Sequence, residues 1–178
     1  TGGMSYLVPR NPDGSSAVPL GGTFVLAAWC SDLTSSISPG TLYSGKIIPA
    51  LVSDAQALLT ADGGPTLNLN NIHRVAWIVN NTAMLEQQYG MSGNDIQNAI
   101  WSLLQGLTDA TSTPFSATNL NLLLNVLSNT TEARNYSPEP TSSDGYPIWI
   151  HAPTKQLIML RITANNVPFW CRLAHRCD

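Results

Sequence analysis

The most evident shortage in this 178-residue sequence is charge. Only 11% of the residues are Asp, Glu, Lys or Arg, against about a quarter in an ordinary soluble domain. The eight basic residues form no cluster and the net charge is −3. Nucleic acids and anionic membrane surfaces are bound largely through clustered Lys and Arg, so we expect neither as a partner. The polar surface must instead be built from Ser, Thr, Asn and Gln, as is common in extracellular proteins.

Long hydrophobic runs are also missing. The longest, such as "IIPALV" and "LIML", fall far short of the roughly 20 residues that a membrane-spanning helix requires, so we expect no membrane insertion. No signal peptide is present, so a secreted protein would be represented here by its mature part. Hydrophobic residues make up 43% of the chain, and its length suits one domain, residues 1–178, with a substantial core.

Cysteine is scarce, with three residues in all. Cys171 and Cys177 lie in "FWCRLAHRCD", where a small disulfide loop is the natural interpretation in an oxidising compartment. A zinc site that adds His175 is the alternative, but it lacks a Cys-x-x-Cys pair and an evident fourth ligand, so we expect no metal. Cys30 is left over as a reactive thiol, an intermolecular bridge or a small buried apolar residue.

Strand signals lie at both ends of the chain and helix signals lie between them. "SYLV" and "TFVLAAWCSD" are short apolar segments near the start, and "YPIWIHAPTKQLIMLRIT" is typical of a hairpin. The helical block begins at "KIIPALVSDAQALLTADGG", where Pro49 suits a first helical turn. We therefore expect an α+β domain. Its strands, at about 5–31 and 145–163, would form a β-sandwich or barrel-like sheet, with a long helical insertion at about 46–129 between them.

The middle of the helical block has clear periodicity. "NIHRVAWIVNN" repeats apolar residues at helical spacing, with Ile72, Val75, Ala76 and Val79 on one face. "AMLEQQYG" is predicted to be a separate short helix that Gly90 ends, and "SATNLNLLLNVLSNT" to be the last helix of the block.

The segment "SGNDIQNAIWSLLQGL" predicts an amphipathic helix with an unusual flank. Ser92 and Asp95 have the spacing of a capping box. Gln97 lies on the flank of the apolar stripe, and Trp101 follows one turn later. Taken alone, Gln97 is a boundary glutamine with a satisfied amide and Cys30 is an inert small hydrophobe. The stripe itself consists of Ile96, Ile100, Leu103 and Leu107.

Together, "AWCSDL" and "IQNAIW" resemble the motifs of the thioester domain family of bacterial cell-surface adhesins. That family pairs a cysteine, usually preceded by an aromatic residue and followed shortly by an acidic one, with a glutamine in a hydrophobic-Gln-x-x-hydrophobic-Trp motif. Here Trp29, Cys30 and Asp32 match the first motif, and residues 96–101 match the second completely. The resemblance covers roughly residues 24–107, and Trp29 stands where the family more often has tyrosine.

The resemblance implies an intramolecular thioester between the Cys30 sulfur and the Gln97 side-chain carbonyl. Such a bond would acylate an amine, for example a lysine, of a surface molecule on a target cell or matrix. Trp29, Trp77 and Trp101 are candidates to shield it from water. The domain would be consumed in one reaction, so it would be a covalent binder and not a turnover enzyme, and it would need no cofactor. It would be a monomeric domain of a longer secreted, cell-wall-anchored adhesin used in host binding.

Two other classes of function remain open. A non-covalent adhesin module that binds protein or carbohydrate would use exposed aromatic side chains and need no bond between Cys30 and Gln97. A cysteine hydrolase or transpeptidase would pair Cys30 with a histidine base, for which His73, His151 and His175 are the candidates. No local protease signature accompanies Cys30.

Overall fold

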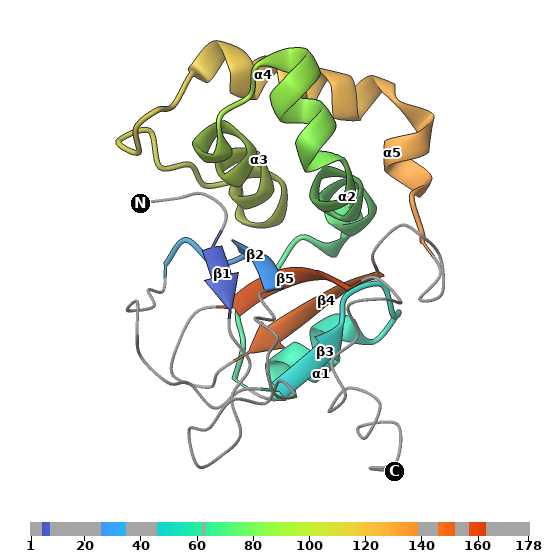
Figure 1. Cartoon of the computed structure of the whole chain (residues 1–178). Coiled ribbons are helices and arrows are strands. Elements are labelled where there is room, and N and C mark those ends of the chain that lie inside the picture. The colour runs from blue at the N-terminus through green and yellow to red at the C-terminus, as the bar shows by residue number, and fades with distance from the viewer. Residues whose placement is uncertain are drawn as a thin grey trace, which may run out of the picture.

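The computed structural model describes residues 5–7, 26–34, 46–61, 63–138, 146–151 and 157–162. In this part of the chain, the strands form one open antiparallel sheet and helices are the larger component (Figure 1). The predicted β-sandwich or barrel-like sheet is therefore wrong. Helices α2 and α3 cover the described sheet where a sandwich would have a second sheet. The five short strands form one open sheet, so they do not close into a barrel.

The C-terminal strands lie inside the sheet, between the N-terminal ones. The order across the sheet is β1-β2-β5-β4-β3, and every neighbouring pair is antiparallel. Because β5 pairs with β2, the hairpin formed by β4 and β5 separates β2 from β3. The strands are β1 (Ser5–Leu7), β2 (Leu26–Cys30), β3 (Lys46–Pro49), β4 (Tyr146–His151) and β5 (Leu157–Ile162).

Most of the helices form two layers over the sheet. α2 contacts β4 and β5, α3 contacts β2, and α4 and α5 pack outside this pair (Figure 1). α1 lies beside β3, away from these layers. None of the helices in the described part is both long and apolar enough to cross a membrane. The helices are α1 (Ala55–Ala61), a short 3-10 turn η1 (Leu69–Asn71), α2 (Ile72–Tyr89), α3 (Gly93–Gln105), α4 (Ala117–Asn129) and α5 (Thr131–Asn135).

The first part of the predicted helical block is a strand. Residues 46–49 pair with β4, so Pro49 ends β3 and the following helix begins only at Ala55. Isoleucine at two successive positions favours a strand. β3 is also an edge strand, where the missing N–H of a proline is tolerated.

α2 is one continuous helix, and the predicted break before "AMLEQQYG" is wrong. The polar residues at the expected break satisfy their side chains within the helix. Asn80, Asn81 and Thr82 each donate to the carbonyl oxygen four residues earlier. These bonds let short polar side chains sit inside a helix instead of ending it.

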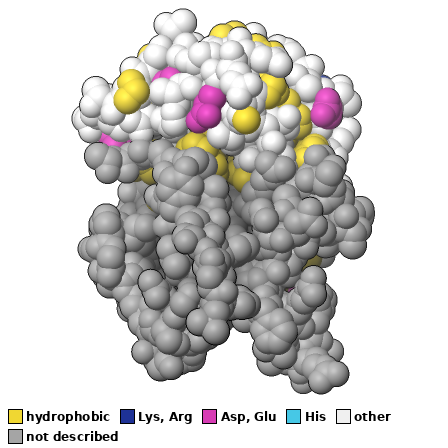
Figure 2. Space-filling model, in the orientation of Figure 1, with side chains coloured by type: hydrophobic (Ala, Val, Ile, Leu, Met, Phe, Trp, Pro, Cys, Tyr) yellow, Lys and Arg dark blue, Asp and Glu magenta, His cyan; other side chains and the backbone are white. Residues whose placement is uncertain are grey.

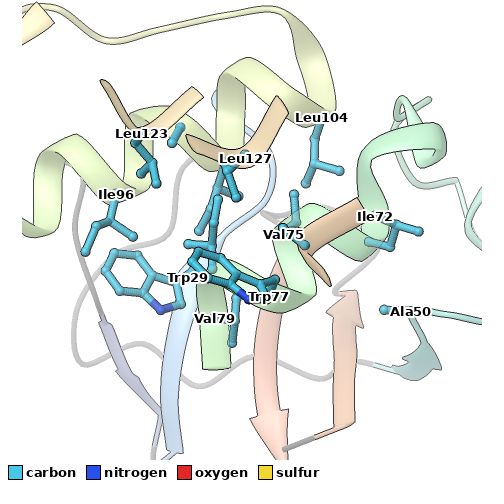
Figure 3. Packing of buried hydrophobic residues seen from close by; sticks show 14 of the residues in the cluster. Trp29, Ala50, Ile72, Val75, Trp77, Val79, Ile96, Leu104, Leu123 and Leu127 are labelled. Atoms are coloured by element: carbon cyan, nitrogen blue, oxygen red, sulfur yellow. The ribbon is translucent and has the colours of Figure 1, made fainter. Parts of the chain in front are cut away.

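The core lies between the sheet and the helices. Trp29 of β2 is buried among side chains from α2, α3 and α4 (Figure 3). The residues labelled around it include Val75, Trp77, Ile96, Leu123 and Leu127. By contrast, the face of the helical layers shown in Figure 2 is mostly uncharged and polar, with scattered hydrophobic and acidic side chains. This surface agrees with the low charge of the sequence.

Asp95 holds the starts of α3 and α4 together. The predicted capping box is confirmed: the Ser92 hydroxyl accepts from the Asp95 N–H at 3.1 Å, and the Asp95 carboxylate accepts from the Ser92 N–H at 2.9 Å. The same carboxylate accepts from the Ser116 N–H at 2.6 Å and from Asn119 Nδ2 at 3.0 Å. Burial raises the pKa of the Asp95 carboxyl, but these hydrogen bonds outweigh burial and leave the pKa below its ordinary value.

We expect Asp95→Asn to lower the free energy of unfolding at neutral pH by about 1–3 kcal/mol, because a buried carboxylate that accepts several hydrogen bonds is replaced by an amide. A lowered pKa in the folded state stabilises the protein above the unfolded pKa of about 3.9. This stability is lost as the pH falls through the folded value. The difference between wild type and variant, measured by urea unfolding, should therefore shrink as the pH falls below about 3.9. The exposed Glu86→Gln change on α2 serves as the control, and an equal effect from it would contradict the prediction.

Candidate functional site

Gln97 and Cys30, separated by 67 residues in the sequence, are joined by hydrogen bonds in the fold. The Cys30 N–H donates to Gln97 Oε1 at 2.9 Å, and Gln97 Nε2 donates to the Cys30 carbonyl oxygen at 2.6 Å. One side-chain amide therefore satisfies both backbone groups of a single residue. Gln97 is fully buried, with an exposed fraction of 0%, although the sequence placed it on the flank of its helix.

The Gln97 amide takes the place of a neighbouring strand. In an antiparallel strand, the N–H and C=O of one residue point to the same side. Those of Cys30 are hydrogen-bonded to Gln97, so they face away from β5, on the edge of β2 where the described residues of β1 pair as far as Ala28. α3 packs over this end of β2. Its Gln97 side chain supplies the hydrogen-bond partners of the Cys30 backbone. The flank position of Gln97 is what lets it reach the strand.

The pairing brings an electrophilic carbon close to the backbone of the residue that carries a thiol. The Gln97 carbonyl carbon is covalently bonded to both Oε1 and Nε2, and both atoms are held against the backbone of Cys30. The carbon must therefore lie beside the residue that carries the sulfur. The Cys30 N–H also polarises the carbonyl, because it donates to the oxygen on which negative charge would develop during attack.

The Cys30 thiol is neutral at physiological pH. The residue is 8% exposed, and burial raises the pKa of its thiol to about 11, with the negative charge of Asp32 adding to the increase. At pH 7 only about one thiol in ten thousand would be ionised, since each pH unit below the pKa is a factor of ten. Any reaction of this sulfur must therefore depend on its position more than on its intrinsic reactivity.

The three tryptophans predicted to shield the site are all buried. Trp29 precedes Cys30 on β2, Trp101 follows Gln97 by one turn of α3, and Trp77 lies on α2. Trp29 and Trp77 belong to the core cluster (Figure 3). The indole nitrogens of Trp77 and Trp101 have no hydrogen-bond partner within the described residues. Burial of these rings serves core packing and exclusion of water alike.

A second glutamine of α3, which the sequence analysis did not single out, contacts the segment after Cys30. Gln105 Oε1 accepts from the Leu33 N–H at 2.8 Å, and Gln105 Nε2 donates to the Asp32 carboxylate at 3.1 Å. The same Asp32 oxygen accepts from the N–H and the hydroxyl of Thr34, at 2.9 and 2.6 Å. The signal in the sequence was the spacing of the two glutamines, which are eight residues or about two helical turns apart.

The candidate histidines are not brought to Cys30 by the contacts of the described residues. His73 Nδ1 bonds to the Tyr136 carbonyl at 2.7 Å. In the sheet, Cys30 is aligned with Ile158 and through it with Ile150. His151 is one position further along β4, across two strand spacings, or roughly 10 Å, from β2. Two of the remaining sequence predictions, the Cys171–Cys177 disulfide and the role of His175, lie outside the described residues.

The described ranges hold no cluster of three or more His, Cys, Asp or Glu side chains suited to a metal ion. Comparisons with models of protein families, with curated proteins and with solved structures find no match for this chain. Function must therefore be inferred from the chemistry of Cys30 and Gln97 themselves.

The two hydrogen bonds of Gln97 should stabilise the fold when no covalent bond can form. In a Cys30→Ala background, which keeps the backbone groups but removes the sulfur, we expect Gln97→Met to lower the free energy of unfolding by about 2–4 kcal/mol, because two buried backbone groups lose their partners. Denaturant unfolding of the single and double variants measures the loss. Gln88→Met, on the exposed side of α2, is the matched control, and a comparable effect there would refute the pairing.

Proposed function

We propose that this chain is a covalent adhesion domain in which Cys30 and Gln97 form an internal thioester that acylates an amine on a target surface molecule. The observation that carries the proposal is the double hydrogen bond that holds the buried Gln97 amide against Cys30. The resemblance of "AWCSDL" and "IQNAIW" to the motifs of the thioester domain family agrees with it.

The contact between the two residues supports formation of the bond as follows. The Cys30 sulfur adds to the Gln97 carbonyl carbon, and the negative charge that develops on Oε1 is stabilised by the Cys30 N–H, 2.9 Å away before the reaction. The intermediate then collapses: the bond from carbon to Nε2 breaks and the carbon–sulfur bond remains. The thiol gives up its proton to solvent before the attack and the departing nitrogen takes one up from water, so the products are a thioester and one molecule of ammonia.

Fixed proximity is the main source of the rate. A primary amide is a weak acylating agent, and the neutral buried thiol is a weak nucleophile. Holding two groups in reactive geometry lowers a barrier by roughly 7–11 kcal/mol when the alignment is good. Cys30 at the end of a strand and Gln97 within a helix are both fixed by secondary structure and by burial.

The second step would attach the protein to its target. An amine, such as a lysine side chain, attacks the thioester carbon, an isopeptide bond forms at Gln97, and Cys30 leaves as a thiol. The domain is consumed in the process, so it acts once, as a covalent binder without a cofactor. This chemistry fits a monomeric domain exposed on a longer secreted protein of the cell surface, anchored in the cell wall and used to bind a host.

A non-covalent adhesin module is the second candidate. The specific observation in its favour is that the Gln97 amide is fully satisfied as it stands, with a hydrogen bond on each side. A glutamine that only replaces a strand partner would look the same. A hydrolase has less support, because His73 is engaged with the Tyr136 carbonyl and not with Cys30.

Intact-mass spectrometry separates these candidates. We expect the protein to be lighter than its sequence by one ammonia, beyond any loss of hydrogen from a disulfide. Methylamine should add to the protein at Gln97 and expose Cys30 to alkylation, and Cys30→Ala should abolish both effects. A full sequence mass, with Cys30 alkylated slowly and methylamine without effect, would leave the non-covalent module as the better description.

The rate of thioester formation should rise with pH. Ammonia reopens a thioester to cysteine and glutamine, so protein treated with ammonia and then desalted provides the starting state. Because the thiolate is the nucleophile and burial raises the pKa of Cys30 to about 11, the rate should increase about tenfold per pH unit from pH 7 to about 10. The loss of ammonia is followed by mass. A rate that does not change between pH 7 and 9 would contradict the assigned ionisation.

A further inference from the structure

α3 holds the chain around Cys30 at two points, and the Gln97 reaction uses only the first. The second is Gln105, whose amide accepts from the Leu33 N–H at 2.8 Å and donates to the Asp32 carboxylate at 3.1 Å. Asp32 is 3% exposed and also orders the backbone after it, through the N–H and hydroxyl of Thr34. Residues 32–34 are thus tied to α3 by polar contacts.

The two contacts lie at different heights along α3. Gln97 and Gln105 lie eight residues apart on α3, or about 12 Å along the helix axis. Cys30 and Leu33 are three residues apart, and the chain bends after Cys30. The same helix therefore carries the electrophile and fixes the chain on the C-terminal side of the nucleophile. Any slip of residues 32–34 along α3 would be transmitted to Cys30.

We propose that Gln105, acting with Asp32, is a positioning residue for thioester formation: it fastens the chain after Cys30 to α3 so that the sulfur stays aligned with the Gln97 carbonyl carbon. This inference rests on the proposed function. Gln105 touches neither reacting atom and acts through Leu33 and Asp32. A misplacement of about 1 Å in such an arrangement is enough to cost roughly 100-fold in rate.

The chemistry of the contact requires a neutral amide at position 105. The Leu33 N–H needs an acceptor, and the buried Asp32 carboxylate needs a donor. Glutamine offers both groups on one side chain. Glutamate in its place would keep the acceptor, lose the donor and set a second negative charge against Asp32, so Gln105→Glu should disrupt the contact with almost no change in size.

The experiment measures the rate of ammonia loss at fixed pH after ammonia treatment and desalting. We expect Gln105→Glu to slow thioester formation about 10–100-fold. Gln105→Met, which removes both bonds without adding charge, should also be slow and serves if the glutamate variant does not fold. Gln88→Glu on the exposed side of α2 is the matched control.

The outcomes separate the two proposals. If wild type never loses ammonia, the proposed thioester function fails. If wild type forms the bond and Gln105→Glu and Gln105→Met form it equally fast, the positioning role of Gln105 is overturned. Denaturant unfolding of each variant in the Cys30→Ala background gives its folded fraction, and a rate that falls only in proportion to that fraction would assign Gln105 a merely structural role.

Discussion

The arrangement of this domain depends on one side-chain amide that occupies the place of a strand. Cys30 is the last residue of β2, and its buried N–H and C=O require hydrogen-bond partners, which Gln97 supplies. This requirement fixes the height and register of α3 over the sheet. The Asp95 contacts then fix α4 relative to α3, and α2 packs alongside. The placement of the helical layers thus depends on the two hydrogen bonds between Gln97 and the end of β2.

The contact between Gln97 and Cys30 would contribute differently to stability before and after a covalent bond forms. As an amide, Gln97 contributes an acceptor and a donor to Cys30. As a thioester it would keep the carbonyl oxygen and lose the nitrogen, so the Cys30 carbonyl would give up the bond that is now 2.6 Å long. An unsatisfied buried carbonyl costs about 1–3 kcal/mol. Other contacts that align the chain, such as that of Gln105, then matter more, because the hydrogen bond from Gln97 Nε2 is lost when ammonia leaves.

Local patterns in the sequence predicted local structure well, and long-range pairing escaped them. The capping box of α3 follows from Ser92 and Asp95 because both partners lie within one turn. Cys30 and Gln97 were selected from motifs, and the structure brings them together. The sandwich or barrel was wrong, because the sequence shows where strands lie but not whether another sheet or a helical layer covers them. Pro49 suits a helix start and a strand edge equally, and only pairing with β4 decides between them. Gln105 was missed because its partners, Asp32 and Leu33, are more than 70 residues away.

The strand order also determines when the site can be completed. β2 has β1 on one side and β5 on the other, and β5 extends to Ile162, more than 130 residues after Cys30. During synthesis, α3 is available long before the strand that fixes the other edge of β2. The contact between Gln97 and Cys30 therefore cannot reach its final rigidity on a partly made chain. A growing polypeptide, surrounded by the amines of other proteins, would thus carry an ordinary cysteine and an ordinary glutamine until β5 is in place.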